Sequence, residues 1–184
     1  MKEVSFIQMK DGTKEDYLLL NEHEKKYIEG TADRLIKFMS GLSNTLEGYQ
    51  ITRLEHSLQT ATRALNDKAD EEMIVAALFH DIGDELAPLN HSEYAGTVLK
   101  PYVSEKTHWI IEKHGEFQMY YYAHHLGGNR NERDKYKGHK YYKDTVDFCE
   151  NWDQKSFDPN YKSLTLKGFE PYVKKIFSRT PYAQ

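Results

Sequence analysis

The stretch AALFHDIGDELAPLNHSEYAG, residues 76–96, decides how we interpret this chain. An apolar run typical of a buried helix ends on two polar side chains, His80 and Asp81, and a further histidine follows at His91. A buried carboxylate costs free energy unless it is paired or bound to a metal. The stretch therefore predicts a buried polar site, and its imidazole and carboxylate groups are ligands that transition metals accept.

Length and composition restrict the class of protein. The 184 residues predict one domain, residues 1–184, with a substantial hydrophobic core. A formal charge of −4 gives no field that would recruit nucleic acid or an anionic membrane, and no apolar run approaches the ~20 residues that span a bilayer. The lone Cys149 excludes an intramolecular disulfide and, with no signal peptide in the sequence, favours a cytoplasmic location.

Apolar residues recur at helical spacing along the chain, and no run alternates with the period of a strand. The fold class is therefore predicted to be all-α. We expect an irregular lead-in over residues 1–16, Thr31 as a helix N-cap, and a surface loop or short helix over residues 127–139. The helical pattern is carried by Leu35, Phe38, Met39 and Leu42; Leu54, Leu58, Ala61 and Leu65; Ile74, Ala77, Leu78 and Asp81; Tyr94, Ala95, Val98 and Leu99; Trp109, Ile110 and Lys113; Tyr142, Val146, Cys149 and Asp153; and Phe169, Tyr172, Val173 and Ile176.

Six residues on or beside these helical stripes could share one metal site. Asp81 and Asp153 are both expected on apolar helix faces, where a carboxylate needs a compensating charge. Neighbours on a helix project about 100° apart, so one of His80 and Asp81 can bind a first metal while the other reaches toward a second. Imidazole with carboxylate suits Fe, Mn, Zn or Co better than Ca or Cu(I). The six candidates are His56, His80, Asp81, His91, His114 and Asp153.

These residues could instead have a packing role without binding a metal. A single buried histidine is more often a packed core residue than a ligand, and we interpret His23 and His108 as ordinary surface or packing residues. The pair His124 and His125 either faces a substrate or is structural. The dense polar aromatics of QMYYYAHHLGG, residues 118–128, favour the first of these interpretations.

In their order along residues 50–155, the six candidates resemble the HD-domain superfamily, and the two histidines between the HD dyad and the last aspartate resemble its two-metal branch. The resemblance implies a single-domain helical bundle around a central dinuclear metal site, with further helices at both ends of the chain packing on it. It implies that the dyad aspartate bridges the two metals. The ligands of the first metal would be His56, His80, Asp81 and Asp153. The ligands of the second would be Asp81, His91 and His114.

The two-metal branch contains two chemistries, and both stay open. The small size and LEHSLQTA, residues 54–61, resemble organophosphonate-cleaving oxygenases, which with myo-inositol oxygenase form the mixed-valent diiron group. This implies two Fe ions, Fe(II)/Fe(III), and a small hydroxylated substrate whose C–P or C–C bond is cleaved with O2. Residues 114–128 and 148–159 resemble bacterial proteins identified as HD phosphohydrolases. That implies hydrolysis of a nucleotide or other phosphoester, with Mn, Zn or Co as alternative metals. A third hypothesis is a sensing or scaffold module that keeps the metal for folding.

Departures from the family pattern bear on the substrate. Asp84 stands where many HD enzymes have Lys or His, Gln118 stands where a phosphonate-cleaving enzyme has Lys, and Tyr49 replaces a glutamate. Two cationic anchors are thus absent, and Asp84 with Tyr49 and the neighbouring tyrosines could instead hold an ammonium group. The predicted substrate-binding residues are Tyr49, Asp84, Gln118, His124, His125 and Arg130. Replacement positive charges could come from Arg63, Arg130, Arg133 or His139. Glu55 and Gln154 are expected to orient neighbouring ligands. The oligomeric state is left as monomer or homodimer.

Overall fold

The computed structural model describes residues 3–44 and 47–182. It confirms the all-α fold, because these residues form helices joined by turns and contain no strand. The α-helices are α1 (Lys14–Glu29), α2 (Thr31–Gly41), α3 (Arg53–Asn66), α4 (Glu71–Phe79), α5 (His91–Leu99), α6 (Glu105–Tyr122), α7 (Tyr142–Phe148) and α8 (Leu166–Phe177). The short helical turns are η1 (Met9–Asp11), η2 (Leu42–Asn44), η3 (Ala123–Leu126), η4 (Glu132–Tyr136) and the π-helical turn η5 (Cys149–Asp153). None of the described helices is long and apolar enough to cross a membrane.

Capping side chains fix where three of the central helices begin. Thr52 caps α3 by accepting a hydrogen bond from the backbone N–H of Glu55, whose carboxylate accepts one from the Thr52 backbone in return. Asp70 caps α4 and Ser104 caps α6 in the same way, each accepting from a backbone N–H three residues on. Each such bond satisfies a donor that the helix itself leaves free.

The predicted N-cap at Thr31 is wrong. Gly30 holds the N-cap position of α2, and Thr31 is already the first helical residue. The Thr31 hydroxyl donates to the carbonyl of Ile28, 2.6 Å away, and so ties α2 to the end of α1 instead of capping α2.

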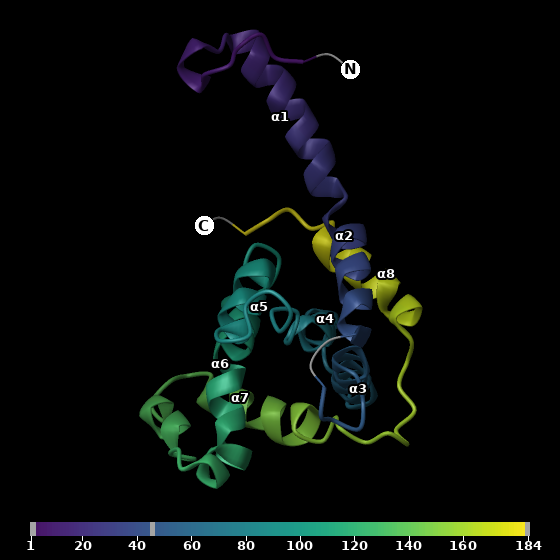
Figure 1. Cartoon of the computed structure of the whole chain (residues 1–184), viewed down its shortest axis with the longest axis vertical. Helices are drawn as coiled ribbons and strands as arrows, with labels where there is room; N and C mark the ends of the chain where they lie inside the picture. The colour runs from purple at the N-terminus through teal and green to yellow at the C-terminus, as the bar shows by residue number, and fades with distance from the viewer. Residues whose placement is uncertain (1–2, 45–46, 183–184) are drawn as a thin grey trace.

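The hydrophobic core is formed by α2 to α8. Helix α4 lies at its centre, with Met73 to Phe79 all buried, which explains why the sequence of α4 is apolar on every side. Helix α3 packs against α4, α5 packs against α6, and α8 packs on α2 and α4 (Figure 1). The π-helical turn η5 reaches back to α3, so segments far apart in the sequence meet around the centre of the bundle.

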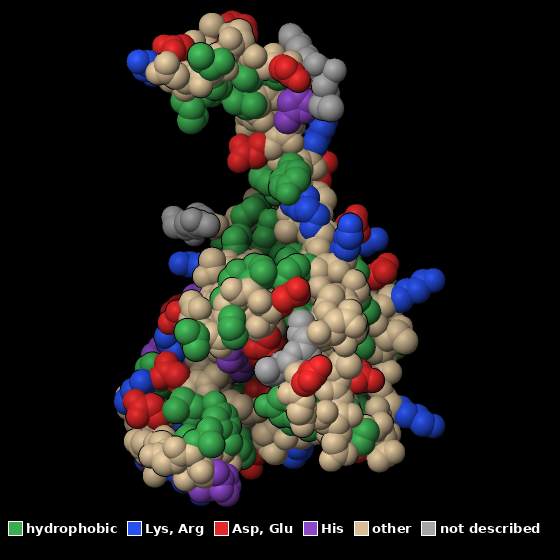
Figure 2. Space-filling model, in the orientation of Figure 1, with side chains coloured by type: hydrophobic (Ala, Val, Ile, Leu, Met, Phe, Trp, Pro, Cys, Tyr) green, Lys and Arg blue, Asp and Glu red, His purple; other side chains and the backbone are tan. Residues whose placement is uncertain are grey.

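Helix α1 projects from this body as an arm (Figure 1). The expected irregular lead-in over residues 1–16 is therefore wrong from Lys14 onward, where Thr13 and Asp16 form a capping box that starts the helix. Among the described residues, none of α1 belongs to the hydrophobic core. Hydrophobic side chains lie on the surface of the arm (Figure 2), and Leu18 of α1 is exposed, as is Ile7 just before the helix. Helix α2, in contrast, contacts α3 and α8.

Shortening Phe169 to alanine tests how α8 holds the bundle together. Phe169 is fully buried, and Phe169→Ala should lower the free energy of unfolding by about 3–5 kcal/mol through lost burial and a cavity. Chemical denaturation measures this change. The control Leu18→Ala on the exposed arm should change stability by no more than about 0.5 kcal/mol. Equal effects of the two substitutions would contradict this account of the core.

Candidate metal centre

The His80–Asp81 dyad lies in a turn rather than on a helix face. Helix α4 ends at Phe79, and the next backbone hydrogen bonds are turn-like, from Ile82 N to the Phe79 carbonyl and from Asp84 N to the Asp81 carbonyl. The expectation that Asp81 continues the apolar face of α4 is therefore wrong. The turn nevertheless keeps both side chains buried, at 0% exposure for His80 and 3% for Asp81.

Gly83 lets the chain after the dyad come close to His91. A Cβ atom built on Gly83 would lie 2.6 Å from the carbonyl oxygen of His91 and 2.7 Å from its Cα, which is closer than real Cβ contacts. Gly115 permits a similar approach from α6, since its Cβ would lie 2.4 Å from the Ser92 hydroxyl. The two glycines therefore allow the start of α5 to sit between the dyad turn and α6.

Asp153 reaches the site through a change of helical pitch. Helix α7 passes into the π-helical turn η5, where Gln154 N donates to the carbonyl of Cys149, five residues back. Such π turns are rare and are often found at functional sites. The regular helical spacing from Tyr142 to Asp153 that the sequence predicts is thus interrupted, although Asp153 still faces inward and is buried.

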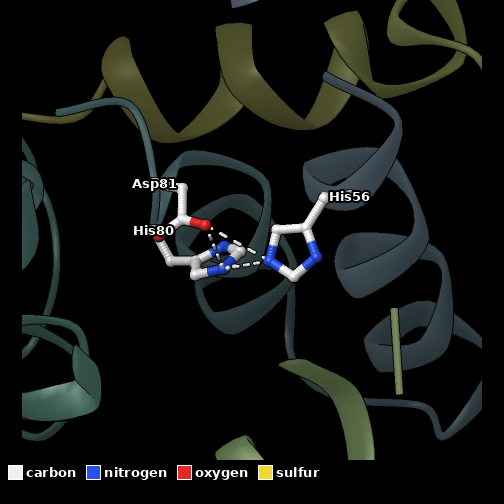
Figure 3. A group of neighbouring side chains, drawn as sticks. All are labelled: His56, His80 and Asp81. Atoms are coloured by element: carbon white, nitrogen blue, oxygen red, sulfur yellow. Dashed lines mark hydrogen bonds and ion pairs between the residues drawn. The ribbon is translucent and has the colours of Figure 1, made fainter. Parts of the chain in front are cut away.

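Two residues from distant parts of the chain, His56 and Asp153, meet around the dyad. Nε2 of His56 lies 3.0 Å from Nε2 of His80 and 3.2 Å from Oδ2 of Asp81, and the three side chains point toward one another (Figure 3). Oδ1 of Asp153 completes this set at 3.2 Å from His56 Nε2 and 3.6 Å from His80 Nε2.

The second oxygen of Asp81 faces a different pair of histidines. Oδ1 lies 3.2 Å from Nε2 of His114 and 3.5 Å from Nε2 of His91. His114 is buried, whereas about a quarter of the His91 side chain is exposed. The structure thus brings together all six candidate ligands, with Asp81 between two sets.

Backbone carbonyls fix how three of the imidazoles are turned. Nδ1 of His56 lies 2.8 Å from the Ser156 carbonyl, Nδ1 of His80 lies 2.8 Å from the Ala77 carbonyl, and Nδ1 of His114 lies 2.7 Å from the Ile111 carbonyl. A carbonyl can only accept, so each Nδ1 carries the proton and donates. In the neutral ring the lone pair is then on Nε2, the nitrogen that faces the cluster.

This arrangement requires a positive charge at its centre. The Nε2 lone pairs of neutral His56 and His80 would face each other across 3.0 Å and also face carboxylate oxygens, which is repulsive unless a proton or a metal ion lies between them. Oδ2 of Asp153 is buried and has no hydrogen-bond partner among the described residues, so it too offers a free lone pair. The donor set is four imidazoles, three of them oriented by backbone carbonyls, and two carboxylates, and it fits a transition-metal ion.

The fold and this cluster define the chain as an all-α protein with a buried His/Asp cluster that could hold a metal ion. Compared with protein-family models and with curated proteins, the sequence matches none.

Electrostatic interactions within the cluster shift several pKa values. Burial lowers the pKa of His80, but the nearby carboxylates of Asp81 and Asp153 outweigh burial and raise it to about 10. The pKa of His56 is raised for the same reason. Burial acts to raise the pKa of Asp81 and of Asp153, yet neighbouring cations and imidazole N–H groups hold both well below the usual range. His91 differs, because burial lowers its pKa.

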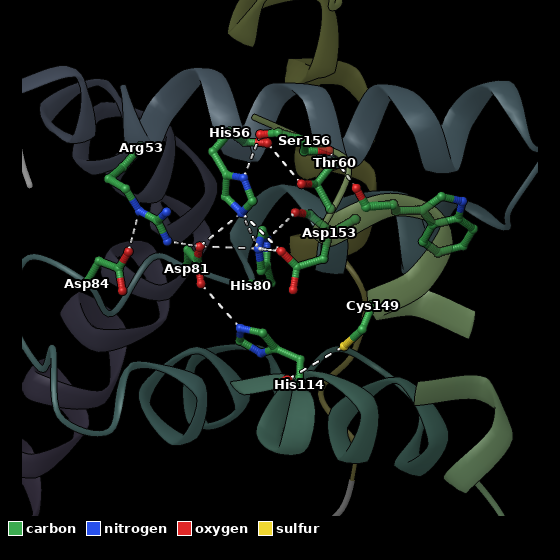
Figure 4. A network of polar contacts seen from close by, with 12 residues as sticks. Arg53, His56, Thr60, His80, Asp81, Asp84, His114, Cys149, Asp153 and Ser156 are labelled. Carbon is green, nitrogen blue, oxygen red and sulfur yellow. Dashed lines mark hydrogen bonds and ion pairs between the residues drawn. The ribbon is translucent and has the colours of Figure 1, made fainter. Parts of the chain in front are cut away.

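Arg53 is a site residue that the sequence reading missed. It is the first residue of α3 and is 8% exposed. Its Nη2 donates to Oδ2 of Asp81, and its Nε donates to Oδ2 of Asp84 across 2.6 Å (Figure 4). Oδ1 of Asp84 also lies 3.6 Å from Nδ1 of His91. The spacing in the sequence indicates this position, because Arg53 is three residues before His56 and therefore lies on the same helix face.

A cavity of about 520 Å³ opens beside the cluster. Three of the predicted substrate-binding residues line it, namely Tyr49, Asp84 and Gln118. Gln118 has a buried Oε1 with no partner among the described residues. Aromatic side chains form part of the wall, where the Tyr49 ring stacks on the ring of Phe157 with 5.2 Å between the ring centres. The full lining is Tyr49, Arg53, His56, Asp81, Asp84, Pro88, His91, His114, Gly115, Gln118, Tyr121, Tyr122, Asp153, Gln154 and Phe157.

Other predicted substrate contacts lie outside this cavity. His124 and His125 are exposed on η3, and Arg130 stacks on the ring of Tyr120, 4.2 Å from its centre. Their role in substrate binding stays a prediction without support from the cavity.

The structure also shows where the residues predicted to supply positive charge, or to orient metal ligands, lie. Arg63, Arg133 and His139 stack on Tyr161, Tyr120 and Trp109, respectively, away from the cavity. Glu55 is engaged in capping α3, so it does not orient a ligand. Gln154 lines the cavity and donates to the Glu150 carbonyl.

Gly83→Ala tests the close approach behind His91. The added methyl group must displace the His91 backbone, so we expect a loss of about 1–3 kcal/mol in unfolding free energy, as for other overpacked sites. Gly138→Ala is the matched control, because nothing lies within 4 Å of its Cβ position. Denaturant unfolding of both variants provides the measurement, and an unchanged stability of Gly83→Ala would show that the turn is looser than described.

The metal-free protein should become less stable as pH rises from about 6.5 toward 10. His80 has its ordinary pKa of 6.5 in the unfolded chain and a pKa of about 10 in the folded one. Its contribution to stability is therefore fully present below pH 6.5 and is lost as pH rises through the folded value. Thermal unfolding after chelator treatment, with His80→Asn as the control, measures the slope. A melting temperature that increases over this range would contradict the assigned direction.

Proposed function

We propose that this chain is a metal-dependent enzyme of the HD-domain type, specifically a non-haem diiron oxygenase. It would use O2 to cleave a C–P or C–C bond in a small hydroxylated substrate. The observation that carries the proposal is the position of Asp81, whose two oxygens face two different sets of imidazoles. One carboxylate between two ligand sets is the arrangement that a bridged metal pair needs.

The two ligand sets are unequal, which supports redox chemistry at a pair of non-equivalent ions. The first set would offer four protein groups, and the second would offer three. Fewer protein ligands leave more coordination positions for substrate and O2. The second set also lies at the more exposed end of the cluster, because His91 is partly exposed while His56 and His80 are buried. When bound, two iron ions would supply the oxygen activation and electron transfer that the side chains lack.

The protein's own part is to orient ligands and to shape the reaction space. The carbonyls of Ala77, Ile111 and Ser156 hold three rings with Nε2 inward. The aromatic wall beside the cluster would limit the access of water, and the amides of Gln118 and Gln154 would provide hydrogen bonds to a hydroxylated substrate.

A two-metal phosphohydrolase is the second candidate, and Arg53 favours it. A guanidinium in the wall of the cavity is well suited to hold a phosphoryl group. Such an enzyme would carry Mn, Zn or Co and would release phosphate from a nucleotide or other phosphoester.

Metal analysis of variants tests the shared carboxylate. His91→Ala and His114→Ala should each reduce the metal content from about two ions to about one per chain, because each removes a proposed ligand of the second metal. The helical circular-dichroism spectrum should be retained. His23→Ala, on the exposed arm, should keep the full content. If both variants bind as much metal as the wild type, the two-metal assignment is wrong.

The same preparation separates the two chemistries. After aerobic purification and partial reduction, an electron paramagnetic resonance signal of a coupled Fe(II)/Fe(III) pair is expected for the oxygenase. Zinc or manganese with nucleotide hydrolysis, and no iron signal, would support the phosphohydrolase instead.

A further inference from the structure

Arg53 and Asp84 are 31 residues apart in the sequence, and nothing in the sequence predicts that they pair. Where the family pattern has a cation after Ile-Gly, this chain has Asp84, yet the structure puts the guanidinium of Arg53 against that carboxylate. Arg53 is the only lysine or arginine among the described residues that line the cavity. The cavity wall thus has one cationic side chain, and it comes from α3.

The guanidinium is held by one edge. Nε and Nη2 each donate to a carboxylate, on Asp84 and Asp81, respectively. A guanidinium has five N–H donors, so both donors of Nη1 and one of Nη2 remain. Nη1 has no hydrogen-bond partner in residues 3–44 and 47–182, and it is not among the buried unpaired atoms. The remaining edge is a fork with the geometry that matches two oxygens of one anion.

Asp84 has little capacity left to bind a cation. Oδ2 accepts from Arg53 across 2.6 Å, and Oδ1 lies 3.6 Å from Nδ1 of His91. Oδ2 is therefore already paired with a donor of this chain, and Oδ1 lies beside an imidazole ring, beyond hydrogen-bond distance. The expectation that Asp84 with Tyr49 holds an ammonium group is not supported by this pairing, since the Arg53 guanidinium itself lies between them, 5.6 Å from the centre of the Tyr49 ring.

We propose that Arg53 is the specificity-determining residue of the cavity, that its free edge binds an oxyanion group of the substrate, and that Asp84 is the positioning residue that holds this edge in place. The inference rests on the proposed function for the identity of the cavity as a substrate site. The oxyanion group is a phosphoryl or a carboxylate, both of which a guanidinium fork accepts. Because Arg53 also contacts Asp81, the bound group would lie beside the metal ligands.

Calorimetric titration with inorganic phosphate tests the proposal on the purified full chain, both metal-loaded and metal-free. Phosphate should bind the wild type, and Arg53→Lys and Arg53→Gln should weaken its binding by about tenfold or more, since neither side chain offers the fork. Arg53→Lys keeps a positive charge beside Asp81, so it provides the test even where Arg53→Gln loses stability. Arg63→Gln is the matched control on the same helix, because Arg63 bonds the Lys155 carbonyl outside the cavity.

Two further probes identify the anion. Acetate in place of phosphate distinguishes a carboxylate from a phosphoryl preference, and choline tests the ammonium alternative. Wild-type protein that does not bind either anion, variants that bind phosphate as tightly as the wild type, or choline that binds more tightly than both anions would each overturn the proposal. Metal content is measured on every sample. A wild type without metal would refute the proposed function, while an Arg53-dependent phosphate affinity in that same protein would still support the anion site.

Discussion

The burial of two ionised carboxylates is the constraint on which this structure depends. Asp81 and Asp153 lie at the centre of a helical bundle where water cannot solvate them, and a charge in such a place is stable only with close partners. Helices α3 and α6, the dyad turn after α4 and the start of α5 each bring a nitrogen to within hydrogen-bonding or ion-pairing distance of these oxygens. The fold thus positions cationic side chains, and side chains that could share a metal ion, around the carboxylates of Asp81 and Asp153.

Several local features position the side chains that contact these two carboxylates. The caps at Thr52, Asp70 and Ser104 set where the helices carrying or preceding ligands begin. Gly83 and Gly115 have no side chain where two backbone segments approach closely. The π-helical turn changes the direction of the Asp153 side chain. The caps stabilise the starts of their helices, whereas Gly115 and the π-helical turn cost some intrinsic helix stability and give a defined ligand position in return.

Much of this could be predicted from the sequence, for identifiable reasons. Long stripes of apolar residues, such as Leu54 to Leu65, specify helices strongly, and the six metal-competent residues lie where those stripes would bury them. The turn at the dyad was not predictable, because the apolar run of α4 gives no periodicity that marks its end. Helix α1 was missed because its leucines cluster at Leu18 to Leu20 instead of recurring along one face. Arg53 shares a helix face with His56, but an arginine at a helix start is ordinary, and its pairing with Asp84 across 31 residues of sequence could not be predicted.

The distance along the chain between the cluster's outermost members has a further consequence. His56 and Asp153 are separated by about a hundred residues, so an ion shared between them would close a very long loop. Chain-entropy models put the effect of a permanent cross-link over a loop of that length at about 4.7 kcal/mol, taken from the conformational freedom of the unfolded chain. A bound ion would thus act as a reversible cross-link between His56 and Asp153. Unfolding and metal release would then be coupled, and the stability of the folded chain would depend on the concentration of free metal.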